Sequence, residues 1–115
     1  MAHRLSPAER ALLGSFLDRL LAAAPADTIS AVRVFGSRAR GEADEHSDLD
    51  VAVELRPGAD RAALHRLAID LAEDAMEAAD AHDLGLAPVM LEAGPLTGLR
   101  AVVARDGIEL WRAPW

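Results

Sequence analysis

Two short stretches of the chain hold residue types that could bind a phosphorylated ligand together with a cation. The first is Gly36-Ser37, which follows an apolar run, and the second is Asp48-Leu49-Asp50, which enters another such run. A glycine lets the backbone approach a ligand closely because it has no Cβ, and the free N–H groups at the start of a helix can receive a phosphate. Paired carboxylates supply the oxygen ligands that Mg2+ accepts beside a substrate phosphate. Together the two stretches predict a site for a nucleoside triphosphate.

The expected phosphate-binding half of the site is built around the start of a helix at Ser37. Its hydroxyl adds a donor to the free N–H groups of that helix, and Arg38 or Arg40 could add charge-assisted hydrogen bonds. Ser47, directly before the first aspartate, completes the expected nucleotide-binding set with Gly36.

The expected metal-binding and catalytic half consists of two aspartates. Asp48 and Asp50 are two residues apart on a predicted strand, so both carboxylates leave the same face, about 6.6 Å apart along the backbone. Two like charges at this spacing disfavour each other's ionisation unless a cation lies between them. Glu54 shares the face but lies about 13 Å beyond Asp50 along the strand, too far to share an ion.

Each stretch also has an interpretation without chemistry. Gly-Ser before a helix commonly forms a turn and an N-cap, and Ser-Asp-x-Asp commonly forms a capped loop with exposed acids. The order, strand context and separation of the two pieces together favour the ligand site. His46, beside Ser47, could reach a phosphate, although a solvated loop histidine is the simpler interpretation.

The spacing of apolar and turn-forming residues predicts the elements that position these stretches. An amphipathic helix begins after Ser6, with Pro7 at its first position and Glu9 completing a capping box, and ends before Pro25. Alternating strands and helices of unequal length predict an α/β or α+β fold, a small mixed sheet with helices packed on it. The other expected elements are strands at 29–35, 48–55, 87–92 and 108–111, and helices at 37–42, from Asp60 to about 81, and at about 97–105.

Length and charge limit the classes of protein that remain. The 115 residues, without cysteine, predict one domain over 1–115 and exclude disulfides and thiolate metal sites. The formal net charge of −7 argues against direct binding of nucleic acid, because such binding relies on basic residues that displace phosphate counterions. No apolar run reaches the length of a membrane helix and no leader is evident, so we expect no membrane association and a cytoplasmic protein.

Residues 34–53 resemble the minimal nucleotidyltransferase (MNT) group of the DNA polymerase β-like superfamily, of the MntA-like antitoxin type. The resemblance rests on Gly36-Ser37, Gly41 and Ser47-Asp48-x-Asp50, and it extends more loosely over nearly the whole chain. It implies the polymerase β-like nucleotidyltransferase fold and transfer of a nucleoside monophosphate, AMP from ATP, to a hydroxyl with release of pyrophosphate. It further implies that Gly36 and Ser37 hold the triphosphate and that Asp48 and Asp50 bind Mg2+.

The chain departs from the pattern it resembles at the third expected carboxylate. Such enzymes usually carry an acid on the next core strand, which helps to hold the metal and activates the acceptor hydroxyl. Here Pro88 or a neighbour stands at that position. Asp83 and Glu92 flank the strand, and we expect neither to replace the missing acid. The missing acid affects the expected catalysis more than the expected binding, because a general base typically raises the reaction rate 10²–10⁴-fold.

The resemblance also implies a partner. Proteins of this group are often encoded beside a HEPN protein, a helical ribonuclease toxin, and some attach AMP to a tyrosine of that toxin. The small size of the chain leaves the acceptor surface to such a partner or to a second copy in a homodimer. Two hypotheses lead: an enzyme that modifies a protein such as a HEPN toxin, and a catalytically degenerate nucleotide-binding antitoxin that acts by complex formation. A third, nucleotidyl transfer to a small molecule such as an antibiotic, is less favoured because we expect no separate acceptor domain.

Overall fold

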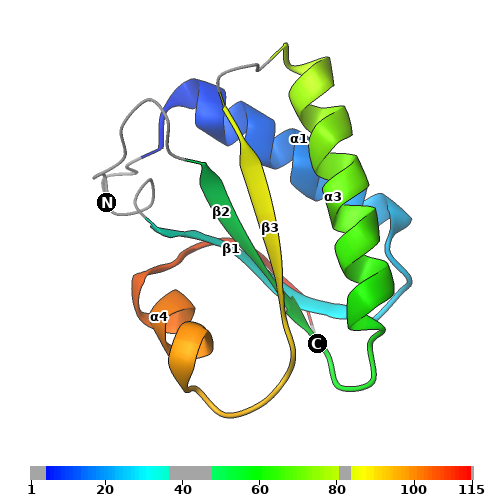
Figure 1. Ribbon diagram of the computed structural model, residues 1–115, viewed down its shortest axis with the longest axis vertical. Coiled ribbons are helices and arrows are strands. Elements are labelled where there is room, and N and C mark those ends of the chain that lie inside the picture. The colour runs from blue at the N-terminus through cyan, green and yellow to red at the C-terminus, as the bar shows by residue number, and fades with distance from the viewer. Residues whose placement is uncertain (1–4, 37–47, 81–83, 115) are drawn as a thin grey trace.

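The computed structural model describes residues 5–36, 48–80 and 84–114, and these form three helices and four strands (Figure 1). The predicted helix at 37–42 lies outside the described residues. The elements differ from the predicted boundaries by at most a few residues. In chain order they are α1 (Pro7–Ala23), β1 (Ile29–Phe35), β2 (Leu49–Leu55), α3 (Arg61–Ala78), β3 (Leu86–Leu91), α4 (Gly98–Asp106) and β4 (Ile108–Arg112).

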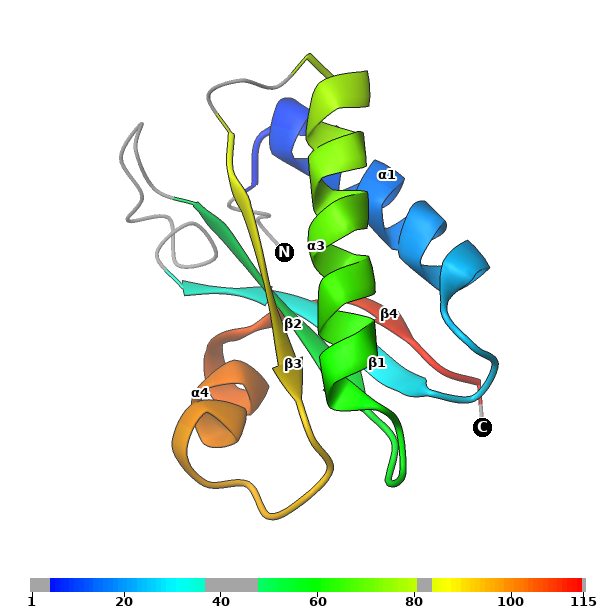
Figure 2. The same cartoon turned by 45° about the vertical axis from the view of Figure 1, so that its right-hand side comes forward.

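The four strands form one mixed sheet in the order β3-β2-β1-β4. β1 is antiparallel to both of its neighbours, whereas β2 and β3 are parallel. A parallel pair needs a crossover connection, and α3 provides it. Figures 1 and 2 show α1 and α3 on one face of the sheet and α4 on the other. The prediction of a small mixed sheet with helices packed on it is confirmed.

Local capping signals set the helix starts. The Ser6 hydroxyl accepts a hydrogen bond from the Glu9 amide at 3.1 Å, and the Ser6 amide donates to Glu9 Oε1 at 2.7 Å. The predicted capping box is therefore present, with Pro7 at the first helical position. At the start of α3, Asp60 Oδ1 accepts a hydrogen bond from the Ala63 amide at 3.1 Å. Both caps satisfy backbone donors that the helix itself leaves free.

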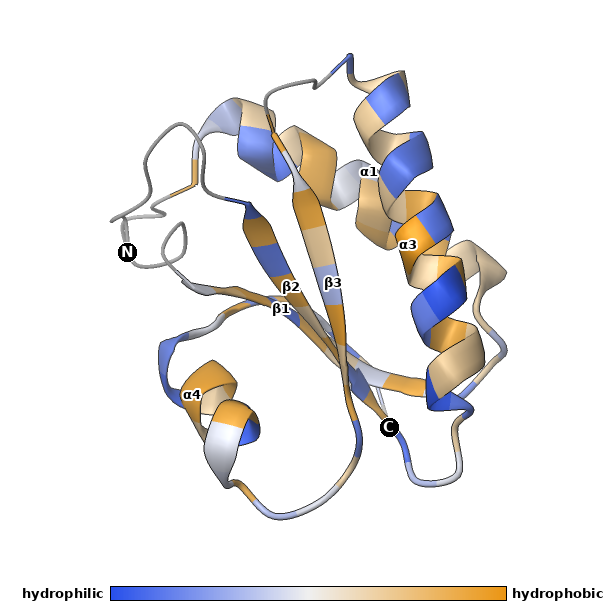
Figure 3. Cartoon of the chain, in the orientation of Figure 1, coloured by the Kyte–Doolittle hydropathy of each residue, from blue (hydrophilic) through white to orange (hydrophobic). Residues whose placement is uncertain are grey.

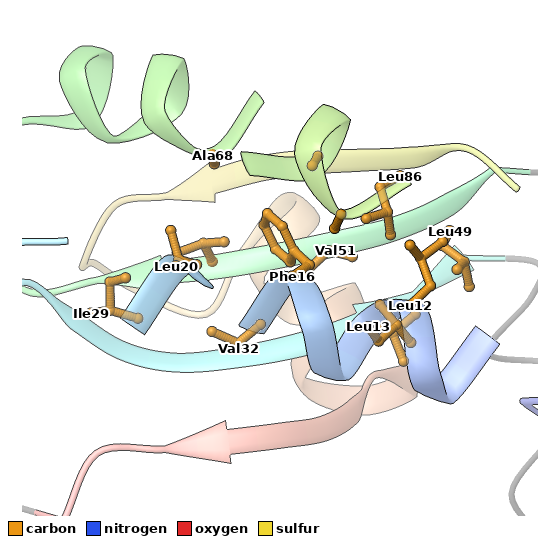
Figure 4. Close-up of a cluster of buried hydrophobic side chains, with 14 of the residues drawn as sticks. Leu12, Leu13, Phe16, Leu20, Ile29, Val32, Leu49, Val51, Ala68 and Leu86 are labelled. Atoms are coloured by element: carbon orange, nitrogen blue, oxygen red, sulfur yellow. The ribbon is translucent and has the colours of Figure 1, made fainter. Parts of the chain in front are cut away.

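The main core lies between the sheet and the helices α1 and α3. Side chains of α1 point onto the sheet, with Phe16 above the middle strands (Figure 4). α3 turns its apolar side toward the sheet and its charged side outward, as Figure 3 shows by colour. Because alternate residues of a strand face opposite sides, each strand gives half of its residues to this core. Fully buried members include Leu12, Leu13, Phe16, Leu20, Val32, Val34, Leu49, Val51, Val53 and Ala68.

The opposite face of the sheet carries a smaller apolar cluster and all of the charged strand residues discussed below. Phe35, Ala52, Leu91 and Val103 are buried there, with Val89 packed against them. Val103 is the contribution of α4, which covers only part of this face (Figure 1). The residues two positions from Ala52 on β2 are acidic, and by strand alternation they share this face.

Within the described residues, no helix is both long and apolar enough to cross a lipid bilayer.

Candidate functional site

The end of β1 and the start of β2 bring Gly36 and Asp50 together. Phe35 and Asp50 are register partners, so Gly36 follows directly beside the aspartate. Gly36 has φ +81°, in the region that favours glycine. A Cβ at this position would collide with Asp50 Oδ2 and would lie 3.3 Å from its Cγ. Glycine is therefore favoured here by its backbone conformation, and the space that it leaves is occupied by the Asp50 carboxylate.

The space left by Gly36 is taken by the Asp50 carboxylate. From the sequence we expect this space to let a ligand approach the backbone. In the structure it first serves to seat a carboxylate against the turn, at the point where the expected phosphate-binding residues begin.

Asp48 has an equivalent relationship with a second glycine, Gly85. The Leu49 amide donates to the Gly85 carbonyl at 2.8 Å, which ties the start of β2 to the residue before β3. A Cβ at Gly85 would lie 3.0 Å from Asp48 Cγ. Sequence reasoning missed Gly85. The only signal was a glycine just before a predicted strand, and its meaning depends on the parallel register of β2 and β3.

The two aspartates lie at one end of the sheet, over different neighbours of β2. Asp48 is exposed and leans toward β3, whereas Asp50 is half-buried and leans toward β1. Burial raises the pKa of Asp50, and the negative charge of Asp48 raises that pKa further. Without a counter-charge this pair is therefore unfavourable when ionised. A divalent cation bound by both carboxylates would remove that cost, so the chemistry of the pair fits Mg2+.

The position beside Asp50 on β3 is occupied by Ala87. Ala87 is the parallel register partner of Asp50, and Pro88 is the partner of Val51, whose side chain belongs to the main core. The residue in the place of the expected third acid is thus Ala87 rather than Pro88. Among the described residues, no group of three His, Asp or Glu side chains is arranged to hold a metal ion.

Of the two acids that flank β3, the structure describes Glu92, and this residue does not join the aspartates. Glu92 follows the strand at its far end and is exposed, with Oε1 3.8 Å from Arg61 Nε. Asp83 lies outside the described residues.

Glu54, the other acid on this face, is paired with Arg33. Arg33 Nη1 lies 2.9 Å from Glu54 Oε2, and the two side chains are only 16% and 14% exposed. The geometry is an ion pair without an aligned hydrogen bond, because Oε2 accepts none from the described residues. Arg33 Nη2 also lies 3.7 Å from Glu109 Oε1 on β4. The negative charge of Glu54 is therefore neutralised by Arg33 on the neighbouring strand β1, and Glu54 is not placed to bind an ion beside Asp50.

Five of the predicted residues, Ser37, Arg38, Arg40, His46 and Ser47, lie outside the described residues. Their roles in holding a nucleotide stay predictions. Of the described part of the predicted site, the structure brings Gly36 and Asp50 into contact, whereas Asp48, two residues before Asp50, lies beside Gly85.

Sequence comparison identifies the kind of domain that carries this arrangement. The family model of the nucleotidyltransferase domain matches residues 12–96, which is most of the chain. The chain belongs to the nucleotidyltransferase domain family. The match begins within α1 and ends after β3, so it includes the glycine turn, both aspartates and the crossover helix.

Solved structures with the same fold support the architecture of this nucleotidyltransferase domain. A crystal structure of a toxin-antitoxin with AMP-PNP is 20% identical, covers 88% of this chain and 73% of its own, and superposes with a TM-score of 0.58. A putative nucleotidyltransferase from Sulfolobus solfataricus is 16% identical, covers 94% of this chain and 89% of its own, and has a TM-score of 0.52. At these identities the likeness shows the fold alone. A search of curated proteins found no significant match.

Proposed function

We propose that this nucleotidyltransferase domain is a minimal nucleotidyltransferase of the MNT type, which transfers AMP from ATP to a hydroxyl of a protein. The single observation that carries the proposal is the seating of Asp50 against Gly36, with Asp48 two residues away at the same end of the sheet. The arrangement joins a glycine turn to a pair of carboxylates. These are the two components that a triphosphate and its cation need.

Each residue has a distinct role in this proposal. Asp48 and Asp50 hold Mg2+, which neutralises phosphate charge and orients the triphosphate when it is bound. Gly36 keeps the Asp50 carboxylate at the turn, because any side chain there would displace it. The residues after the turn bind the phosphates through their N–H groups, hydroxyls and guanidinium groups, with Ser37, Arg38, Arg40 and Ser47 in this set.

The partner that we propose is a protein acceptor, a HEPN-type toxin. The structural neighbour with AMP-PNP is a toxin-antitoxin, and the same fold covers most of both chains. The MNT resemblance of residues 34–53 favours the same partner. A helical ribonuclease toxin with an accessible tyrosine hydroxyl is thus the acceptor to test first.

Intact-mass spectrometry tests this proposal directly. The purified chain is mixed with the toxin, ATP and Mg2+, and the toxin is expected to gain the mass of one AMP. Asp48→Asn and Asp50→Asn should each abolish the gain. Asp70→Asn, which removes an exposed acid from the outer side of α3, is the matched control and should leave it unchanged. An unmodified toxin under all conditions would contradict AMP transfer.

A second function, a nucleotide-binding antitoxin that acts by complex formation, is favoured by Ala87. This residue stands beside Asp50 in the register of β2 and β3, where an acid would assist the acceptor hydroxyl. If toxin activity is blocked without a mass change, and the block survives Asp48→Asn, the complex-forming function replaces the transferase.

A further inference from the structure

The two edges of the sheet differ in their capacity to accept another strand. β3 forms one edge, and its residue Pro88 has no N–H to donate. The Leu49 amide bonds to the Gly85 carbonyl, so in a parallel ladder Gly85, Ala87 and Val89 face β2. Pro88, which alternates with them, therefore faces outward. A proline at an outward position blunts an edge against strand addition.

β4 forms the other edge and has no proline within its bounds. The Ala113 amide donates to the Ser30 carbonyl at 2.9 Å, and Ala31 is the register partner of Arg112. In an antiparallel pair the hydrogen-bonded and non-hydrogen-bonded positions alternate, so the peptide groups of Arg112 point away from β1. No described strand pairs with that side of β4. The edge thus offers a backbone donor and acceptor at Arg112.

The side chains of β4 form a self-complementary charge pattern. The register of β1 and β4 shifts between Val32 and Arg33, so Leu110 is an extra residue of β4, a β-bulge. This bulge places Glu109 and Arg112, which are both exposed, on the same side of the strand, with Arg112 Nη2 2.7 Å from Glu109 Oε1. Glu109 pairs with Arg33, which alternates with Ala31 on β1, so the peptide groups of Glu109 point outward as those of Arg112 do.

If two copies of β4 are placed antiparallel about a two-fold axis between Leu110 and Trp111, Glu109 of each copy lies opposite Arg112 of the other. Opposite charges across an antiparallel pair stabilise it, and like charges destabilise it. Leu110 and Trp111 occupy the centre of this arrangement.

An apolar hollow of about 270 Å³ borders the same edge. Trp111 of β4 forms one wall, and Leu21, Pro25 and Ile29 form much of the rest. The hollow lies where α1 ends and β1 begins, on the α1 side of the sheet. A strand added to β4 would bring further apolar side chains to the mouth of this hollow.

We propose that β4 is a homodimer interface, at which two copies of the chain join their sheets through antiparallel β4 strands. The blunted β3 edge, the outward peptide groups of Arg112 and the self-complementary pair of Glu109 and Arg112 select this edge and a second copy as its occupant. A two-fold axis makes the contact self-complementary and closes the assembly at two chains. The interface lies at the opposite edge of the sheet from β3 and goes beyond the proposed nucleotidyl transfer.

Sedimentation velocity on the full chain tests the interface. Over a concentration series from about 5 µM to about 500 µM, a range suited to a small interface, the mass should rise from 12.2 kDa toward twice that value. Hydrogen exchange of the Arg112 amide should slow over the same range. A mass that stays at one chain throughout would overturn the proposal.

Charge variants identify the edge. Glu109→Arg alone and Arg112→Glu alone place like charges opposite each other, and each should weaken self-association by tenfold or more. A mixture of the two variants restores both opposite-charge pairs and should dimerise again. Arg66→Glu, the same charge change on exposed α3, is the control and should dimerise as the unmodified chain does. Two outcomes would overturn the β4 assignment. One is self-association that neither β4 variant weakens, and the other is a mixture that stays monomeric although each variant melts as a folded protein.

Discussion

The Asp50 carboxylate fills the space that a Cβ would need at Gly36. This contact couples two residues that are fourteen positions apart in the chain, across the pairing of β1 and β2. A side chain at Gly36 would therefore have to move the Asp50 carboxylate. The backbone conformation of the turn and the position of the proposed metal ligand are therefore a single structural property.

Gly36→Ala should destabilise the protein and also remove its response to Mg2+ and nucleotide. An alanine at φ +81° costs about 1 to 2 kcal/mol through backbone strain, and its Cβ displaces the Asp50 carboxylate. Gly58→Ala is the matched control, since Gly58 has φ +85° but no atom within 4 Å of an added Cβ. Urea unfolding gives the stability of each variant, and calorimetry with Mg2+ and a non-hydrolysable ATP analogue gives its binding.

The two glycine variants should lose comparable stability, but only Gly58→Ala should keep normal binding. Equal binding by both variants would show that the position of Asp50 beside Gly36 is irrelevant to the ligand.

The raised pKa of Asp50 predicts a specific pH dependence of stability. In the window between the ordinary value of 3.8 and the raised folded value, the native state binds more protons than the unfolded state. Stability therefore falls as the pH rises through this window, and the loss is complete above the folded pKa. Asp50→Asn removes this dependence, so at pH 7 without metal the variant should melt a few degrees above the unmodified protein.

Thermal unfolding from pH 3.5 to pH 7, with and without Mg2+, tests whether stability falls as the pH rises and whether Asp50→Asn removes this fall. The advantage of Asp50→Asn should grow with pH and then level off. Millimolar Mg2+ with nucleotide should raise the melting temperature of the unmodified protein and not that of the variant, because only the former binds the ion in the folded state. A variant that melts below the unmodified protein at pH 7 would contradict this account of the site.

Local signals in the sequence were sufficient for the elements and for the start of the site. Both predicted N-caps are present: Ser6 forms a capping box with Glu9 at the start of α1, and Asp60 caps α3. The strand at 29–35 has the bounds that the sequence predicts. Its β-branched and aromatic residues stop at Gly36, and a glycine at the end of such a run indicates a sharp turn. These features depend on neighbours within a few residues, so sequence patterns can predict them.

Relationships across strands could not be predicted in the same way. Gly85 lies beside Asp48, and Ala87 beside Asp50, only because β2 and β3 pair in one parallel register. A shift of one residue would put Pro88 on the face of Asp50, and the sequence does not contain the register explicitly. The pairing of Glu54 with Arg33 depends in the same way on which strand lies next to β2.

Arg33→Met should destabilise the fold without affecting the proposed site. It leaves the Glu54 carboxylate, which is 14% exposed, without its counter-charge, and the cost should be about 2 to 3 kcal/mol. The double variant Arg33→Met with Glu54→Met removes both charges and should return to within about 1 kcal/mol of the unmodified protein. Urea unfolding measures both variants. Nucleotide binding measured on each should be normal, and a loss of binding in the folded double variant would assign this pair to the site instead.

Ala87→Asp should create the third carboxylate that the register of β2 and β3 makes possible. The new side chain would stand beside Asp50 on the same face of the sheet, so a third negative charge joins the pair. Without metal the variant should therefore be less stable than the unmodified protein, by about 1 kcal/mol or more. With Mg2+ the variant should become the more stable of the two proteins, because three carboxylates hold the ion more strongly than two. Calorimetry should show tighter Mg2+ binding in the presence of the ATP analogue.

Ala87→Asn separates charge from size in this experiment. It adds a side chain of nearly the same volume without the negative charge, and it should bind Mg2+ no better than the unmodified protein. If Ala87→Asp binds the ion tightly and also raises the rate of AMP transfer to the toxin, the missing acid limits catalysis in the natural chain, in line with the 10²–10⁴-fold that such a group contributes. If both variants bind Mg2+ equally, residue 87 does not face the metal, and the proposed geometry around Asp50 is wrong.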